Sequence, residues 1–414
     1  QQNVSRQEDI YPLVYYYIAY GYQNLHRKEN TEQANCYMTM YVTLGENAAA
    51  DGCFPHRTED YIVLKSLAEE YHLAMAYYYL GCLLYDRRVY DESIEDYEES
   101  ILRSPDFPTV HRNLALAYYN VKKLPQRAYE EMEKAFALDE TDARVYLELD
   151  QLKKRLNVAV KERWSDMEKH FDLVESRDDL YLEYVTLLNT LGEPEKALGL
   201  IKARKFHQWE GGEGKVAAQY LTALYQLAKA AVEKEDYAEA KELLLRAVGE
   251  YPHNLGEGKL ESGQENNLYY LLGLVQEKLG EAKDAFESLT RACCGESEPV
   301  GMMYYNDQPP EMIYYQGLAY RMLGEEEQAV RRFQKLVDYG REHIRDDVKI
   351  DYFAVSLPDL LIFEENLNER NRKHCLFMMS LGLKGLGRID EAEKCAEELL
   401  AMDNAHQEIR VHDL

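Results

Sequence analysis

Three segments of the sequence carry most of the side chains that could bind a ligand. The first places an imidazole and a guanidinium after a Phe-Pro pair, and a guanidinium suits carboxylate or phosphate recognition. The second combines glycines with an indole, carboxylates and an amine, so its backbone can approach a ligand closely beside a flat apolar surface. The third joins acidic and aromatic side chains. The predicted ligand-binding residues are Phe54, His56 and Arg57, then His207, Trp209, Glu210, Glu213 and Lys215, and finally Asp351 and Tyr352.

Each of these segments also has a purely structural interpretation. Phe54 and Trp209 would fill gaps between helices, the glycines would end helices, and the charged side chains would face water. The Trp209 segment lacks the G-x-x-x-x-G-K-[ST] spacing of a phosphate-binding loop, and no strand precedes it. Ligand binding and structural packing therefore both remain open for these loops.

The sequence contains no recognisable catalytic or metal-binding pattern. Its 11 histidines are scattered, and neither H-E-x-x-H nor G-x-S-x-G occurs. The seven cysteines form no C-x-x-C pair and no Cys/His metal register. We predict no catalytic residue, no metal site and no cofactor, and the chain alone fits a binding protein better than an enzyme.

Composition narrows the class of partner. The chain has 48 basic and 75 acidic residues, a net charge of -27, and such a field repels nucleic acid and anionic lipid. No apolar run is long enough to span a membrane. An odd number of cysteines without a disulfide framework favours a reducing compartment. We therefore expect a cytoplasmic location and neither a nucleic-acid nor a membrane partner.

The spacing of small and bulky residues predicts a stack of helical hairpins. In the clearest copy the characteristic positions are Leu80, Gly81, Leu84, Ser93, Tyr97, Ser100 and Pro105. This is the spacing of a tetratricopeptide repeat of about 34 residues, and the chain resembles that family. The resemblance implies an all-α fold, a right-handed superhelical solenoid of tetratricopeptide-like helical hairpins whose concave face binds a partner.

We expect roughly eight or nine hairpins divided into four parts. A helix is predicted at Thr58 to Tyr71, and Val348 to Phe363 has no convincing helical stripe and carries Pro358. The expected parts are irregular N-terminal hairpins at 1–75, repeats at 76–205, further repeats at 206–339 after the Gly/Trp loop, and a long spacer with a C-terminal capping hairpin at 340–414.

Clusters of tyrosine mark the start of several first helices. Successive residues rotate by about 100° around a helix, so adjacent tyrosines cannot all face the same core. Part of each cluster is expected to point towards the concave face or a neighbouring hairpin. The clusters are Tyr15 to Tyr17, Tyr77 to Tyr79, Tyr269 with Tyr270, and Tyr314 with Tyr315.

Four segments resemble a narrower family. They are FPHR at 54–57, AYYYLGCLLYD at 76–86, FHQWEGGEGK at 206–215 and DYFAVSLPDLL at 351–361. They are similar to the C-terminal repeat region of large bacterial proteins whose N-terminal part is a mutarotase-like domain of unknown function. This resemblance implies a setting in carbohydrate metabolism and, as a partner, a β-sandwich domain of the same polypeptide.

The preferred hypothesis is a non-catalytic interaction scaffold that binds a protein domain or extended ligand on its concave face, and a further option is a regulatory repeat protein that captures peptides. The alternative is an accessory part of a bacterial glycan-active enzyme whose loops contact a saccharide. The alternative predicts that the three loops converge on one cavity, with Trp209 partly exposed beside carboxylates. The scaffold hypothesis predicts that the loops are dispersed.

Overall fold

The computed structural model describes residues 10–29, 31–209, 211–259, 263–301, 307–349 and 362–412. Helices are the regular structure of these residues, and no strand occurs among them, which confirms the predicted all-α class. The chain divides into two compact units, residues 1–152 (unit 1) and 153–414 (unit 2). Each unit is described separately below.

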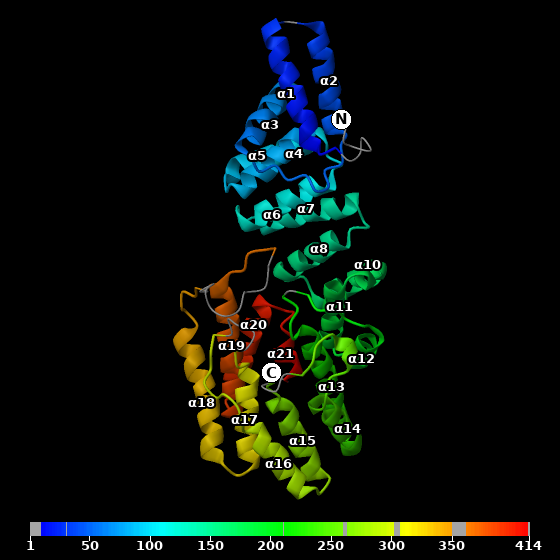
Figure 1. The fold of residues 1–414 in the computed structure, drawn as a ribbon. Coiled ribbons are helices and arrows are strands. Elements are labelled where there is room, and N and C mark those ends of the chain that lie inside the picture. The colour runs from blue at the N-terminus through cyan, green and yellow to red at the C-terminus, as the bar shows by residue number, and fades with distance from the viewer. Residues whose placement is uncertain are drawn as a thin grey trace. The chain divides into compact units, whose positions relative to one another are not determined.

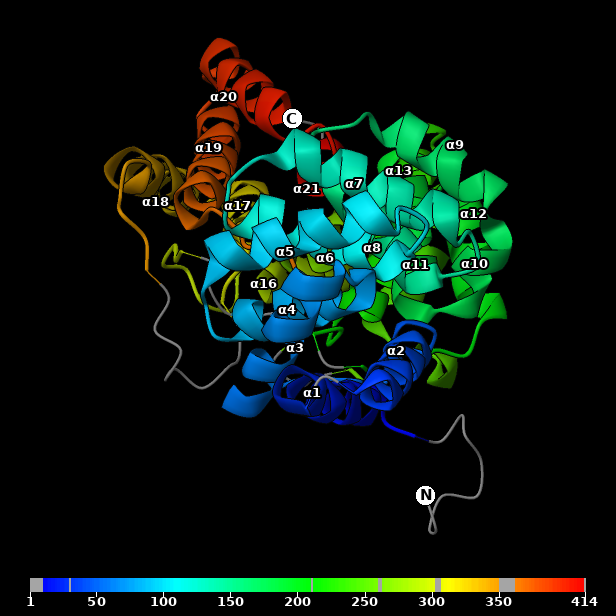
Figure 2. The same ribbon diagram turned by 90° about the horizontal axis from the view of Figure 1, so that it is seen from above.

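Unit 1 is a series of antiparallel helical hairpins. Helices α1 and α2 lie side by side (Figures 1 and 2), as do α4 with α5 and α6 with α7, while α3 packs on α1 and α4. The predicted helix at Thr58 to Tyr71 is confirmed as α3. The helices are α1 (Pro12–Glu29), α2 (Glu32–Glu46), α3 (Thr58–Tyr71), α4 (Ala74–Asp86), α5 (Tyr90–Arg103), α6 (Pro108–Asn120), α7 (Pro125–Leu138) and α8 (Ala143–Arg155), which crosses the unit boundary.

Unit 2 continues the same arrangement. Its helices are α9 (Val160–Lys169), α10 (Phe171–Ser176), α11 (Asp178–Thr190), α12 (Pro194–Ala203), α13 (Lys215–Glu233), α14 (Tyr237–Val248), α15 (Asn266–Lys278), α16 (Ala282–Ala292), α17 (Pro310–Met322), α18 (Glu326–His343), α19 (Leu367–Gly385), α20 (Ile389–Met402) and α21 (Gln407–Val411), with a short 3₁₀ helix at His253–Leu255. The first helices of the hairpins, α11, α13, α15, α17 and α19, pack on one another in order. We call the face that they form the inner face of unit 2.

Small residues allow the paired helices to approach closely. Ser93 donates from its hydroxyl to the Gly81 carbonyl at 2.7 Å, and a Cβ added to Gly81 would lie 2.5 Å from the Tyr97 ring. In α15 a Cβ on Gly273 would lie 2.7 Å from Leu289 Cγ of α16. The alternation of small and bulky positions that predicted the hairpins therefore has a steric cause.

The Gly273→Ala variant tests this steric cause. We expect it to lower the unfolding free energy of unit 2 by about 1 to 3 kcal/mol, because the added methyl group overpacks the α15–α16 contact. Both tryptophans, Trp164 and Trp209, belong to unit 2, so urea unfolding followed by tryptophan fluorescence reports on that unit. The control is Gly199→Ala in α12, where the added Cβ meets no atom within 4 Å and helix propensity predicts a small gain. Equal effects of the two changes would contradict the steric explanation.

The predicted irregular spacer is only partly described. Residues 350–361, with Asp351, Tyr352 and Pro358, lie outside the described residues. The described end of the spacer joins the body of unit 2, because Phe363 is fully buried and its carbonyl accepts a hydrogen bond from Arg155 Nη2 at 3.1 Å.

Candidate functional site

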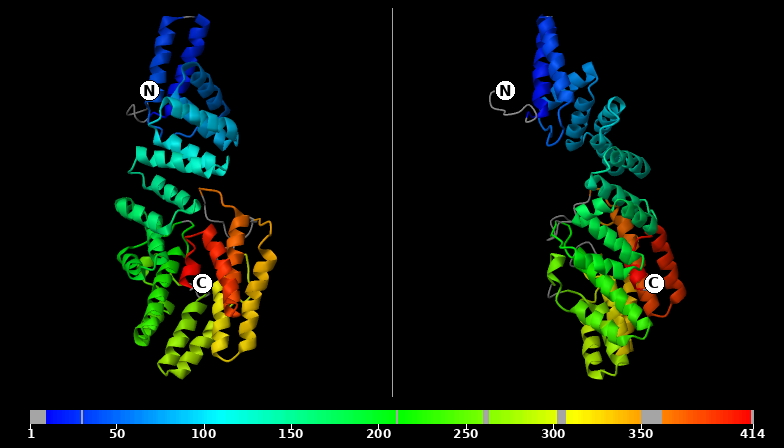
Figure 3. Two further views of the ribbon diagram at one scale, coloured as in Figure 1. Left: turned by 180° about the vertical axis from the view of Figure 1, so that it is seen from behind. Right: turned by 90° about the vertical axis from the view of Figure 1, so that its right-hand side faces the viewer.

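The inner face of unit 2 holds a segment of the chain itself. Residues 403–412, which we call the docked segment, include α21 and lie between helices α11 and α13 on one side and α17 and α19 on the other (Figures 1 and 3). Its buried side chains are Gln407, Ile409, Val411 and His412, which are 8%, 0%, 7% and 7% exposed. Glu408 and Arg410 are exposed, so buried and exposed side chains alternate along this short helix.

Two asparagines fix the start of the docked segment. Asn157, in the turn between α8 and α9, has φ 58, a left-handed conformation that asparagine tolerates better than most residues. Its side-chain oxygen accepts from the Asn404 main-chain N–H at 2.8 Å, and its main-chain carbonyl accepts from Asn404 Nδ2 at 2.7 Å. The Asn157 amide group also donates to the Ala401 carbonyl at 3.1 Å.

Gln407 exchanges amide hydrogen bonds with the inner face. Gln219 Nε2 of α13 donates to Gln407 Oε1 at 2.9 Å. In return, Gln407 Nε2 lies 3.2 Å from the Thr186 carbonyl and 3.2 Å from Thr190 Oγ1, both in α11. Because Asn189 Nδ2 donates to Gln219 Oε1 at 2.9 Å, these amides form one connected network.

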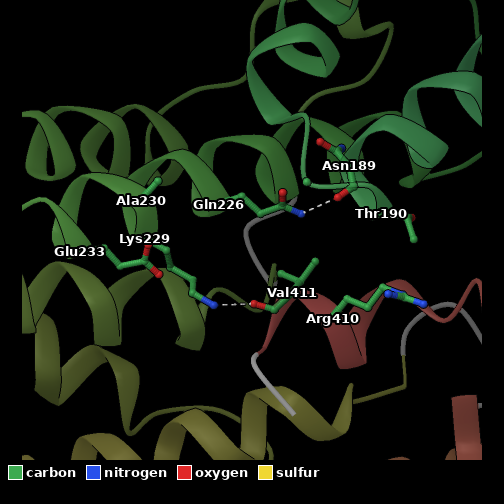
Figure 4. Close-up of a pocket in the computed structure, with 9 residues that line it drawn as sticks. Asn189, Thr190, Gln226, Lys229, Ala230, Glu233, Arg410 and Val411 are labelled. Carbon is green, nitrogen blue, oxygen red and sulfur yellow. Dashed lines mark hydrogen bonds between the residues drawn. The ribbon is translucent and has the colours of Figure 1, made fainter. Parts of the chain in front are cut away.

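A small cavity lies beside the end of the docked segment. Lys229 Nζ of α13 donates to the Val411 carbonyl at 2.8 Å, and Figure 4 shows these residues facing one another. The cavity, of about 180 Å³, is lined by Asn189, Thr190, Gly192, Gln226, Lys229, Ala230, Glu233, Arg410 and Val411. Asn189 is 1% exposed, and its Oδ1 has no hydrogen-bond partner among the described residues. The fit between the segment and this part of the face is thus incomplete.

His412 ends the docked segment in a tyrosine cluster. Its Nδ1 lies 2.9 Å from the Tyr315 hydroxyl, which is 2.6 Å from the Tyr225 hydroxyl. Burial, with smaller contributions from the charges of Lys229 and Lys384, lowers the pKa of His412 to about 3, so the buried ring is neutral. Tyr315 therefore faces the docked segment while Tyr314 packs on Phe333, which confirms for this pair the predicted divergence of adjacent tyrosines.

A buried carboxyl group lies at the start of α17. Burial raises the pKa of Glu311 to about 8, and the Glu408 carboxylate of the docked segment adds to this rise. Glu311 is therefore mainly neutral at pH 7.

The Trp209 loop is held in place by neighbouring residues. The Asp178 carboxylate accepts from the His207 main-chain N–H at 2.8 Å, and the Glu257 carboxylate accepts from the Gly214 N–H at 2.8 Å. A Cβ on Gly212 would overlap the indole of Trp209, so the ring lies over that glycine. The structural interpretation therefore accounts for the glycine and for part of the indole surface.

A cavity of about 510 Å³ lies next to this loop. Its lining residues are Gln208, Glu250, Tyr251, His253, Gly256, Glu257, Gly258 and Lys259. The predicted residues His207, Trp209, Glu213 and Lys215 are not among them, and Glu210 lies outside the described residues. Of this loop, Gln208 lines the cavity, and ligand binding by the predicted residues stays a prediction.

The Phe54 segment belongs to unit 1. Phe54 is 74% exposed, and the main-chain N–H groups of His56 and Arg57 both donate to Asp60 Oδ2 at 2.9 Å. These bonds start α3 and leave the imidazole and guanidinium exposed. The predicted binding residues thus fall in unit 1, in unit 2 and outside the described residues, and their roles stay predictions.

The docked segment was not among the predicted site residues. A signal for it was present: Gln407, Ile409 and Val411 alternate with Glu408 and Arg410, after the end of α20 at Met402. Sequence alone could mark this pattern as half-buried, but it gave no indication of the helices that bury it.

Comparison with known proteins identifies the repeats. Models described as tetratricopeptide repeat match residues 78–143 and 225–299, and a second such model matches 311–339. Within the described residues, no helix is long and apolar enough to traverse a lipid bilayer.

Solved structures give distant matches. YrrB, a TPR protein with an unusual peptide-binding site, is 18% identical over 45% of this chain and 90% of its own, with a TM-score of 0.34. PilW, a type IV pilus biogenesis factor, is 13% identical over 56% and 92%, with a TM-score of 0.31. The structure of Naa15/Naa10 bound to HypK-THB is 10% identical over 92% and 58%, with a TM-score of 0.38.

Proposed function

We propose that the tetratricopeptide repeats of this chain build a non-catalytic protein-interaction scaffold, and that the inner face of unit 2 binds a short peptide segment of a partner protein. One observation carries this proposal: the inner face already holds part of the docked segment, residues 407–412, through side chains of α11, α13 and α17.

The chemistry of the contacts favours a peptide over other ligands. Lys229 and Asn157 bond main-chain groups of the docked segment, and Gln219 bonds a side-chain amide. Main-chain donors and acceptors supply affinity for an extended or helical peptide, while pockets for individual side chains supply specificity. A net charge of -27 disfavours a nucleic acid at the same face.

Selection from a library of random twelve-residue peptides on the full chain tests this function. In a chain that also carries Ile409→Asp, which removes a buried anchor of the docked segment, we expect the selected peptides to lose at least about tenfold in affinity on adding Gln219→Ala/Lys229→Ala. Each substitution then removes a hydrogen bond to the peptide without also releasing a competing segment. Lys196→Ala is the matched control, since Lys196 lies on the second helix α12 and its side chain is 62% exposed. Peptides that bind equally with and without Gln219→Ala/Lys229→Ala would place recognition elsewhere on the chain.

A second candidate is saccharide binding at the cavity beside the Trp209 loop. Tyr251 offers a ring for stacking, and Glu250 and Glu257 offer hydrogen-bond acceptors. This is the alternative of an accessory part of a bacterial glycan-active enzyme, with a β-sandwich domain of the same polypeptide as partner. Thermal melting with a panel of oligosaccharides distinguishes saccharide binding from peptide binding. A sugar bound at this cavity would raise the melting temperature of both the wild type and the Gln219→Ala/Lys229→Ala variant, because neither substitution is in the cavity lining.

We also propose that the protein is located in a reducing compartment such as the cytoplasm. All seven cysteines are free, and disulfides are rare where cellular thiol systems keep cysteines reduced. The buried thiols of Cys53 and Cys375 pack within the two units, and burial raises the pKa of each, which suits inert structural thiols.

A further inference from the structure

We propose that residues 403–412 are a displaceable intramolecular ligand, which must leave the inner face of unit 2 before a partner segment with the same recognition side chains can bind there. This inference rests on the proposed function and adds to it the regulation of the face and the chemistry of the partner.

The docked segment is held by a mainly polar interface. Its aliphatic anchors are Ile409 and Val411, whereas Asn404, Gln407 and His412 are held through hydrogen bonds. A hydrogen bond exchanged for one with water changes the free energy by only about 0.5 to 1.5 kcal/mol. Such an interface can therefore open at a lower cost than an apolar helix contact.

The helix of the docked segment depends on the inner face. It is five residues long, from Gln407 to Val411, and isolated helices shorter than about 12 residues are marginal in water. Once released, the segment would lose its helix. Docking and helix formation are consequently one coupled event that a competing segment can reverse.

The docked segment does not fill its part of the inner face. A cavity of about 180 Å³ remains beside Val411. A partner segment whose side chains fill this cavity would bury more apolar surface than the chain's own segment and would bind more tightly.

These contacts define the partner. It is a protein segment with the order Asn-x-x-Gln-x-Ile-x-Val-His, or close equivalents, that forms one short helical turn on binding.

The test measures binding of a fluorescein-labelled peptide of residues 401–412 to full-length proteins by fluorescence anisotropy. Tethering keeps the chain's own segment at a high effective concentration, so the wild type should bind the peptide weakly. The Ile409→Asp variant places a carboxylate at a fully buried position and should release the segment. We expect at least about a tenfold gain in affinity, since the apparent dissociation constant scales with the fraction of open sites.

Matched controls isolate the release of the segment. Ile389→Asp makes the same substitution on α20, where Ile389 is 47% exposed, and should bind like the wild type. Asn404→Ala removes the bonds to Asn157 and keeps the test usable if Ile409→Asp disturbs the fold, which tryptophan fluorescence would reveal. A labelled peptide with aspartate in place of Ile409 should not bind any of these proteins.

Hydrogen exchange at residues 404–412 reports release independently of binding. If Ile409→Asp and Asn404→Ala release the segment but bind the peptide no better than the wild type, the segment is not a ligand of the face and the inference is wrong. Continued protection of the segment in both variants would also overturn it, because the named anchors would not hold it. Either result leaves the proposed function standing if library peptides still depend on Gln219 and Lys229.

Discussion

The Glu183→Ala variant should lose about 3 kcal/mol of the unfolding free energy of unit 2, because the buried Arg163 guanidinium would lose a carboxylate partner. Arg163 in α9 has a side chain that is 0% exposed, and its Nη2 lies 2.7 Å from Glu183 Oε1 of α11. Lys154 Nζ lies 3.2 Å from the same oxygen. Urea unfolding followed by tryptophan fluorescence measures the loss.

The expected loss depends on pH in a defined direction. Burial by itself would raise the pKa of Glu183, but the charges of Lys154 and Arg163 outweigh it and hold that pKa well below the usual range. A carboxyl group with a lowered pKa stabilises the fold above its unfolded value of about 4.3 and loses this contribution as the pH falls. The difference between wild type and variant should therefore be largest at neutral pH and shrink in acid.

Two further variants control for general effects of losing a charge. Glu287→Ala removes a carboxylate that is 64% exposed and lies 3.7 Å from Lys283, so its effect should stay within about 1 kcal/mol. The double variant Arg163→Met/Glu183→Leu removes both the buried Arg163 charge and the partly exposed Glu183 charge, and should recover much of the stability that Glu183→Ala loses. A loss below about 1 kcal/mol for Glu183→Ala would contradict the buried ion pair.

The second large effect is the acid sensitivity of His412. Its pKa in the folded chain is about 3, against an ordinary value of 6.5, so the unfolded chain takes up the proton first as the pH falls. Stability is therefore present above about pH 6.5 and lost towards pH 3. Between pH 7 and pH 4.5 the wild type should lose about 2 to 3 kcal/mol relative to His412→Gln, at about 1.36 kcal/mol for each pKa unit.

Other charged groups around the docked segment must be separated from this effect. Lys229, Lys384 and His406 act on His412, and Glu311, whose pKa is raised to about 8, has the opposite sign because its contribution is lost as the pH rises from about 4.5 to 8. These groups are present in both proteins, so they largely cancel in the difference between wild type and His412→Gln. Equal pH profiles for the two proteins would show that His412 is not buried in solution.

The size of the acid effect also bears on the docked segment. Release of the segment exposes His412 to water. If release costs less free energy than global unfolding, His412 becomes protonated in the released state while the rest of unit 2 stays folded. The measured loss would then level off at the free energy of docking. His253→Gln, at an exposed position, is the control for a histidine outside the segment.

Local regularities made the hairpins readable from the sequence. Gly81 pairs with Tyr97 and Gly273 with Leu289 within about 16 residues, so the steric relation repeats along the chain at a short, fixed spacing. The turns between paired helices also have a local sequence signal. Gly280 adopts φ +78 between α15 and α16, a conformation in which glycine is the least strained residue. Periodicity of this kind predicts which helices pair.

An all-α chain of stacked hairpins can be predicted from the residue spacing alone, because every relation needed for that conclusion lies within one or two repeats. The occupant of the inner face of unit 2 cannot be predicted in this way. The bonds that join Asn157 to Asn404 and Gln219 to Gln407 connect residues 247 and 188 positions apart, and no local spacing encodes such pairs. Side chains from α11, α13 and α17 meet the docked segment only after stacking brings distant helices onto one face, so the site is a property of the fold.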